Sequence, residues 1–130
     1  MKVYDKTVVA IKGAAQRGKS GSAREFAMQV ARKYPHDVLV STMQQGVTDF
    51  RLVIRIKKLV VAIETQGDPG TDLAGRLKDV ISNYKPDILV CTCRTRGDTL
   101  EAVENLKRNY QVIYTSTYSC SRSRYDSASE

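Results

Sequence analysis

Short apolar runs alternate along the chain with longer segments in which apolar residues recur every three or four positions. The runs TVVAIK at residues 7–12 and DVLVST at residues 37–42 are short and β-branched, which is typical of strands buried inside a sheet. Between them, the spacing of apolar residues predicts an amphipathic helix over residues 20–34, which Pro35 ends. The apolar face of this helix consists of Ala23, Phe26, Ala27, Val30 and Ala31.

The middle of the chain predicts a hairpin. Side chains alternate in character over residues 52–57, which favours a strand with one exposed face carrying Val53, Arg55 and Lys57. A tight turn at Lys57 and Lys58 and a second apolar run at residues 59–63 then predict a buried antiparallel partner.

The last part of the chain repeats the pattern of helix and strand. Helical spacing predicts helices over residues 73–84 and 99–109, with Asp72 as the N-cap of the first. Apolar runs predict buried strands over residues 87–92 and 111–115. The order of these elements predicts an α/β fold, a three-layer α/β/α sandwich whose sheet is mainly parallel with one antiparallel strand.

The length of 130 residues suits one hydrophobic core. We expect one domain over residues 1–118, followed by a polar, serine-rich tail at residues 119–130 that we expect to be disordered. No apolar run approaches the roughly eighteen residues of a membrane helix. No cleavable leader is apparent either, so we expect a cytoplasmic protein with no membrane partner.

Three cysteines form no disulfide pattern, which favours a reducing compartment. Cys91 and Cys93 lie two apart in a predicted strand and therefore share a face, where they could supply two ligands of a metal site. Because His36 is the only histidine, small core residues are the simpler interpretation.

The formal charge of +7 favours anionic partners, such as nucleotide phosphates, nucleic acid or acidic membrane surfaces. The basic residues are scattered, and no basic helix face or aromatic RNA-binding pattern is present. Nucleic acid is therefore the weaker alternative.

The sequence GAAQRGKS follows the first predicted strand and precedes the first predicted helix. It matches G-x-x-x-x-G-K-S through Gly13, Gly18, Lys19 and Ser20. Glycines let backbone N–H groups surround a phosphate, the lysine adds a positive charge, and the serine hydroxyl can bind Mg²⁺. The helix that starts here also directs its positive end at the anion. We expect Lys19 to be exposed at the loop, so that its removal weakens nucleotide binding without disturbing the fold.

Through this motif and its strand–loop–helix setting, the chain resembles the P-loop NTPase superfamily. In its small size the chain also resembles small uncharacterised bacterial P-loop proteins of the nucleotide-kinase-like type. The resemblance implies the P-loop NTPase fold and a nucleoside triphosphate bound with Mg²⁺. The nucleotide-binding residues that it implies are Gly13, Arg17, Gly18, Lys19, Ser20, Gly21 and Gly67.

The resemblance also implies an acidic residue at the end of a later strand. LVVAIETQGD supplies Glu64 there and Asp68 four residues on, so Ser20, Glu64 and Asp68 become candidate magnesium residues, with a plain strand-end glutamate as the alternative. ETQGD is also similar to the D-x-x-G switch element of GTPases, with Gly67 as its glycine. The guanine-specifying N-K-x-D pattern is missing, which favours ATP over GTP.

Arginines occupy the loop after the strand at residues 87–92. Arg94 and Arg96 lie at the predicted ligand edge, where they could neutralise charge during phosphoryl transfer or simply face solvent. Asp98 is expected to cap the following helix. Three polar stretches, GAAQRGKS, ETQGD and TCRTRGD, all follow predicted strands and should meet at the carboxyl edge of the sheet.

Together these features predict a Mg²⁺-dependent nucleoside triphosphate-binding protein that acts as a phosphotransferase or hydrolase. Lys19, Glu64, Arg94 and Arg96 are the candidate catalytic residues. A non-enzymatic nucleotide sensor that signals to a protein partner is the alternative, and an accessory nucleic-acid protein is the third. A partner protein or homo-oligomer is compatible with a chain too short for a large lid.

Overall fold

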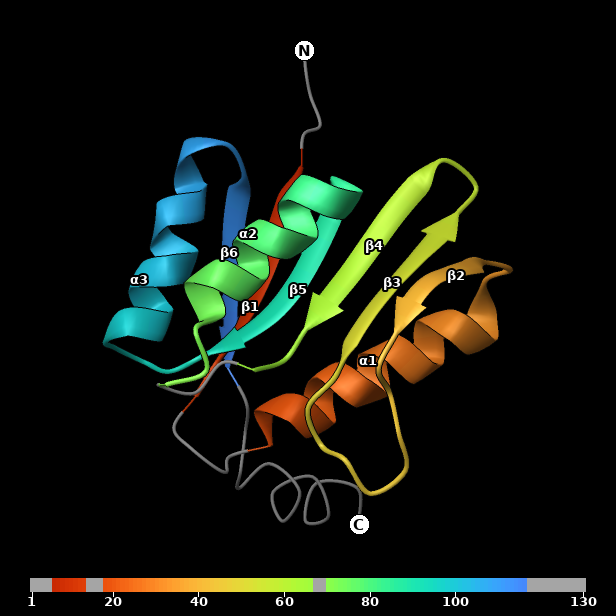
Figure 1. Ribbon diagram of the computed structural model, residues 1–130, viewed down its shortest axis with the longest axis horizontal. Coiled ribbons are helices and arrows are strands. Elements are labelled where there is room, and N and C mark those ends of the chain that lie inside the picture. Colours follow the sequence, from red (N-terminus) through yellow and green to blue (C-terminus); the bar gives the residue numbers. More distant parts are fainter. Residues whose placement is uncertain (1–5, 14–17, 67–69, 117–130) are drawn as a thin grey trace, which may run out of the picture.

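The computed structural model describes residues 6–13, 18–66 and 70–116 and consists of one mixed sheet with helices on both faces (Figure 1). The strands, in chain order, are β1 (Thr7–Lys12), β2 (Asp37–Ser41), β3 (Arg51–Ile56), β4 (Leu59–Glu64), β5 (Ile88–Cys93) and β6 (Gln111–Ser116). The helices are α1 (Lys19–Lys33), α2 (Leu73–Tyr84) and α3 (Asp98–Glu104), and the 3₁₀ turn η1 (Asn105–Arg108) continues α3.

The strand order across the sheet is β2-β3-β4-β5-β1-β6. β4, β5, β1 and β6 are parallel neighbours, whereas β3 runs antiparallel to both β2 and β4. The predicted α/β class, with a mainly parallel sheet and one antiparallel strand, is confirmed. In consequence β1, β4 and β5 end at the same edge of the sheet, and β3 begins there.

Two hydrophobic clusters fill the space between the sheet and its helices. On one face α1 packs through Ala23 and Ala27 onto Ile54 and Ile63. On the other face α2 and α3 pack onto a cluster that includes Leu77, Val80, Leu89, Cys91, Cys93 and Val103. The molecule therefore has three layers, with α1 behind the sheet and α2 and α3 in front of it in Figure 1. Cys91 and Cys93 are fully buried core residues, as the simpler interpretation predicts.

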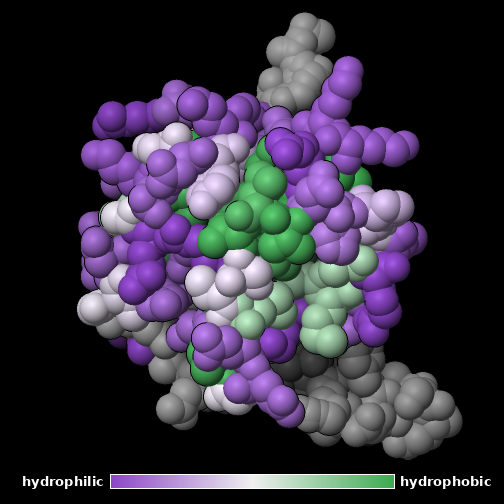
Figure 2. Space-filling view, turned by 45° about the vertical axis from the view of Figure 1, so that its right-hand side comes forward, coloured by the Kyte–Doolittle hydropathy of each residue, from purple (hydrophilic) through white to green (hydrophobic). Residues whose placement is uncertain are grey.

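The helices do not cover the whole front face. α2 and α3 stand over the β6–β4 side in Figure 1, and the β2–β3 side carries no helix there. Figure 2 brings this side forward and shows apolar side chains at its centre, surrounded by hydrophilic ones. Val40 and Val60 are partly buried residues of the cluster on this face.

The prediction of a half-exposed β3 is wrong for Val53. This residue is fully buried, while Arg55 is exposed as expected. The reason is the position of β3 between two strands, which lets the α2-side cluster extend across it. The turn at Lys57 and Lys58 is confirmed by the pairing of Ile56 with Leu59.

Of the two N-caps that the sequence predicts, the structure confirms one and contradicts the other. The Asp72 side chain accepts a hydrogen bond from the N–H of Gly75 (3.3 Å), which confirms it as the N-cap of α2. Asp98 is not the cap of α3, because the helix already begins at Asp98 and Gly97 holds the cap position.

Within the described ranges, no helix is long and apolar enough to cross a membrane. The tail predicted at residues 119–130 lies outside them.

Candidate functional site

The candidate phosphate loop joins the carboxyl end of β1 to α1. Gly13 donates its N–H to the carbonyl of Cys93 at the end of the neighbouring β5 (3.1 Å), which fixes the start of the loop in the sheet. At its other end Gly18 adopts a left-handed conformation with φ of 81°, where glycine is free of strain, and α1 begins at the next residue. Residues 14–17, Arg17 among them, lie outside the described ranges.

Lys19 is buried, with 6% of its surface exposed, and the expectation of an exposed lysine is wrong. It is the first residue of α1 and one of the buried residues of that helix. Its charge and that of Lys12 both lower the pKa of Cys93, so the ammonium group lies near the end of β5. Burial is the larger effect and raises the pKa of Cys93 to about 11.

Ser20 is the second residue of α1, and its hydroxyl donates a hydrogen bond to the carboxylate of Asp49 (2.7 Å). The hydroxyl of Thr65 donates to the same carboxylate oxygen (3.0 Å) and accepts the N–H of Phe50 (2.9 Å). Thr92 of β5 donates its hydroxyl to the Thr65 carbonyl. These bonds connect α1, the residues before β3, and the residues that follow β4.

The sequence analysis did not predict Asp49 and Thr65 as site residues, although the order of the strands could have indicated Asp49. Because β3 is antiparallel to β4, the residues just before β3 lie at the same edge as the ends of β1, β4 and β5. Once the hairpin is predicted, Thr48 and Asp49, which precede the strand, belong to that edge.

Glu64 lies at the end of β4 but on the other face of the sheet from Ser20. Successive residues of a strand point to opposite faces, so Ile63 packs toward α1 while Glu64 faces α2. Its carboxylate is 1% exposed and accepts a hydrogen bond from Nε of Arg51 (2.6 Å). The predicted role of Glu64 with magnesium stays a prediction, and Asp49 is the carboxylate that contacts Ser20.

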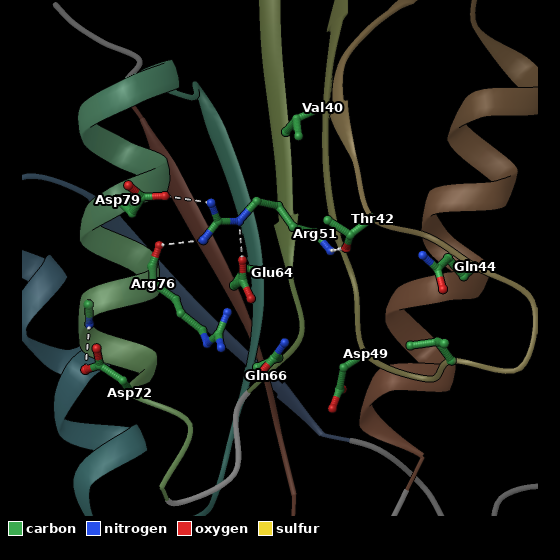
Figure 3. A pocket seen from close by; sticks show the side chains of 12 residues that line it. Val40, Thr42, Gln44, Asp49, Arg51, Glu64, Gln66, Asp72, Arg76 and Asp79 are labelled. Atoms are coloured by element: carbon green, nitrogen blue, oxygen red, sulfur yellow. Dashed lines mark hydrogen bonds and ion pairs between the residues drawn. The ribbon is translucent and has the colours of Figure 1, made fainter.

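Arg51 connects three elements through its guanidinium group (Figure 3). Besides Glu64, it pairs with Asp79 of α2 through Nη1 (2.7 Å) and donates from Nη2 to the carbonyl of Arg76 (3.3 Å). Burial alone would lower the pKa of Arg51, but the hydrogen bonds and charges of Glu64 and Asp79 outweigh it and the net shift is upward. Both carboxylates therefore favour the charged form of Arg51.

A pocket of about 660 Å³ lies beside this network, between α2, the start of β3, the end of β4, and the residues after β2 (Figure 3). Asp49, whose carboxylate accepts the hydrogen bond of Ser20, is one of its lining residues. Its other lining residues are Val40, Thr42, Gln44, Val47, Arg51, Glu64, Gln66, Asp72, Gly75, Arg76 and Asp79.

The remaining predicted residues take different places. Arg94 is partly buried and its N–H donates to the Thr99 hydroxyl (2.9 Å), whereas Arg96 is exposed; both follow β5 at the common edge. Gly67 and Asp68 lie outside the described ranges. Gly21 lies in the first turn of α1 and is exposed.

In the described ranges, only small groups of side chains could bind a metal ion together. These ranges contain no group of three or more His, Cys, Asp or Glu side chains that could hold a metal ion. The Ser20 hydroxyl and the Asp49 carboxylate could supply two oxygen ligands to Mg²⁺, an ion that takes few protein ligands and completes its shell with phosphate and water.

No protein-family model and no curated protein matches the sequence. One solved structure, titled "Structure of EndoMS in apo form", is similar at a TM-score of 0.40 and 14% sequence identity. The match covers 74% of this chain and 47% of that one, so the chain spans about half the length of that protein. A likeness this weak identifies neither a family nor a function.

Proposed function

We propose that the chain is a Mg²⁺-dependent nucleoside triphosphate-binding protein with a P-loop NTPase fold, and that it acts as a phosphotransferase or hydrolase. The observation that carries the proposal is the hydrogen bond between Ser20 at the start of α1 and Asp49. It places a hydroxyl and a carboxylate side by side where the G-x-x-x-x-G-K-S motif requires a magnesium ligand.

The electrostatics of α1 support an anion at its N-terminus. Among the described residues, the first turn of α1 contains no acidic side chain. The N-terminus of a helix carries the positive end of its dipole, which favours a bound anion, and the positive charge of Lys19 belongs to the same turn.

In this proposal Lys19 and Gly18 hold the phosphates, and Ser20 and Asp49 hold Mg²⁺. Glu64, Arg94 and Arg96 are candidates for the transfer step, together with Gly13, Arg17, Gly21, Gly67 and Asp68 as further contacts. ATP is favoured over GTP, because the sequence lacks the guanine-specifying pattern. The pocket bordering Asp49 offers room for a second molecule, which favours an enzyme over a sensor or a nucleic-acid accessory protein.

The first test is thermal unfolding with ATP, ADP, GTP and GDP, each with and without Mg²⁺. At a ligand concentration a hundredfold above Kd, binding adds about 2.7 kcal/mol and raises Tm by on the order of 10 °C. We expect ATP with Mg²⁺ to give the largest shift. Ser20→Ala and Asp49→Asn should reduce the part of the shift that depends on Mg²⁺.

Lys19→Ala should abolish the ATP shift. Because Lys19 is buried, we also expect this variant to be less stable than the wild type in the absence of ligand. Lys33→Ala, at the exposed end of α1, is the matched control and should keep the full shift. No shift with any nucleotide in the wild type would contradict the proposal. A shift without measurable release of phosphate would favour the sensor.

A further inference from the structure

The fold gathers basic residues that lie far apart in the sequence. β1, β2, β4, β5 and β6 begin, and β3 ends, at one edge of the sheet, which we call the amino edge. It is the upper edge in Figure 1 and lies opposite the candidate phosphate loop. α1, α2 and η1 also end there, because each leads into the start of a strand. Six exposed basic residues occupy this edge: Lys6, Lys33, Lys57, Lys58, Lys85 and Arg108.

The amino edge carries an excess of positive charge. Its carboxylates in the described part of the chain are Asp37, which stands opposite Arg55 in the sheet, and Asp87, which accepts the N–H of Val60 (2.9 Å). No ion pair joins any of the six basic residues to a carboxylate of the described ranges, in contrast to Arg51. Exposed cations gathered in this way attract a polyanion, and a chain of phosphate groups is a partner of that kind.

The helix dipole accounts for only half of this charge. Lys33, Lys85 and Arg108 lie at the C-terminal ends of helical segments, where a cation offsets the negative end of the dipole. The other three basic residues lie on no helix, so the dipole gives no reason for their charge.

Two of these lysines occupy backbone positions that favour glycine. Lys57 in the turn between β3 and β4 has φ of 57°, and Lys85, which follows α2, has φ of 47°. The left-handed region strains a side chain, and glycine is the usual residue both in such a turn and after a helix. The fold alone therefore favours glycine at both positions, and the lysines bring their charge to the amino edge at a conformational cost.

Tyrosine rings lie among these cations. Tyr34 follows α1 and is 44% exposed, with Nζ of Lys33 5.9 Å from the centre of its ring. Tyr84 at the end of α2 and Tyr110 before β6 are half-buried. Rings beside cations let a single strand stack its bases while the cations hold its phosphates. The bases of a duplex are already stacked on one another and cannot use the rings in this way.

We propose that the amino edge binds single-stranded nucleic acid. Its phosphates lie along the six basic residues, and a base stacks on Tyr34. β3 and β6 are four strand spacings apart, or about 19 Å, so the edge is long enough for several phosphates. The basic residues look scattered in the sequence because only the fold brings them together. This inference goes beyond the nucleotide chemistry proposed above and does not depend on it.

Fluorescence anisotropy tests the proposal with a labelled oligothymidylate of about twenty nucleotides, in the absence of ATP and Mg²⁺, between about 50 and 200 mM NaCl. We expect affinity to fall steeply with salt, with a slope of log K against log [NaCl] of about −0.7 for each phosphate that is neutralised. At the upper salt concentration a duplex of the same length should bind more weakly, because salt weakens the phosphate contacts and leaves the stacking of bases.

The double variant Lys57→Gly/Lys85→Gly separates binding from folding. It should bind the oligonucleotide about tenfold more weakly at low salt and lower the salt slope by about 1.4, because two cations are lost. Its Tm should not fall, since glycine relieves the strain at both positions. The matched control Lys78→Ala/Arg96→Ala removes two exposed cations from the middle of α2 and from the opposite edge. Its affinity should stay within about twofold of the wild type, because salt screens distant charges.

The aromatic contact is tested at Tyr34. Tyr34→Ala should weaken binding about tenfold, and Tyr34→Phe, which keeps the ring, should bind like the wild type. No binding of the oligonucleotide at low salt, an equal loss in the control variant, or tighter binding of the duplex at the upper salt concentration would overturn the proposal. Complete displacement of the oligonucleotide by phosphatidylserine vesicles, at an equal concentration of anionic groups, would also overturn it and identify a membrane surface instead. Because no nucleotide is present in this measurement, failure of the proposed function leaves its result unaffected.

Discussion

A single guanidinium group connects two strands and a helix at the wall of the candidate pocket. Arg51 holds the buried carboxylate of Glu64, the exposed carboxylate of Asp79 and a backbone carbonyl of α2. The two ion pairs differ in strength, because the side chain of Glu64 is 1% exposed and that of Asp79 is 53% exposed. The bond to Glu64 matters for stability, while the bond to Asp79 mainly orients α2.

Replacing Arg51 with methionine should destabilise the protein by about 3 kcal/mol, because it leaves the Glu64 charge buried without a partner. Urea unfolding measures the change. Arg51→Lys should recover only part of it, since an ammonium group cannot reach three acceptors at once. The double variant Arg51→Met/Glu64→Leu should recover most of the stability lost in Arg51→Met.

Asp79→Asn is the control for this series and should cost less than about 1 kcal/mol. If Arg51→Met costs no more than Asp79→Asn, the ion pair with the buried Glu64 does not stabilise the fold in the way proposed here.

At the scale of the element, the position of a strand in the sheet decides which of its faces is buried. β3 is followed by the tight turn that the sequence predicts, but its pattern of alternation suggests a strand with one exposed face. In the fold β2 pairs beyond it and places it inside the sheet. The alternation shows only that Arg55 is exposed, whereas Val53 packs on the α2 side.

A pair of identical substitutions tests this difference. Val53→Thr puts a hydroxyl into a fully buried site of similar shape and should cost about 1–3 kcal/mol. Val38→Thr on the neighbouring β2, where 55% of the surface is exposed, should change stability by less than about 0.5 kcal/mol. Chemical denaturation of both variants gives the comparison, and equal costs would mean that β3 is as exposed as its pattern suggests.

Much of the fold could be predicted because it depends on local patterns. The period of apolar residues locates β1, α1 and α2, and the Asp72 cap follows from its side chain. Lys19 and Asp49 could not be placed in this way. The burial of Lys19 depends on how α1 packs against the end of β5, and the contact of Asp49 with Ser20 joins residues 29 positions apart.

At the scale of the whole molecule, the centre of the sheet protects its side chains from solvent. β5 lies between β4 and β1, and its Cys91 and Cys93 face the cluster beneath α2 and α3. Reagents can reach these thiols only when the sheet opens, which ties their reactivity to global unfolding.

Thiol labelling measures this protection. With Cys120→Ser removing the third cysteine, the native protein should show no fast-reacting thiol at pH 8, because a pKa of about 11 leaves Cys93 about one part in a thousand ionised. Burial raises the pKa of Cys91 too. Both should react at once in denaturant, and fast labelling of the native protein would show that β5 is accessible.

The same raised pKa gives a direction for stability. Folding favours the neutral thiol of Cys93. The contribution of this thiol to the free energy of unfolding is therefore complete below the ordinary thiol pKa of 9.0, and it is lost as the pH rises toward about 11.

The place of β1 in the sheet also has a consequence for synthesis. Its two neighbours are β5 and β6, the last two strands of the described residues. A nascent chain therefore carries the G-x-x-x-x-G-K-S sequence before the strands that pair with β1 have been made, and the edges of β1 stay unpaired in the meantime. A chain that stops before residue 88 would contain the whole G-x-x-x-x-G-K-S motif and still lack both partners of the strand that supports it.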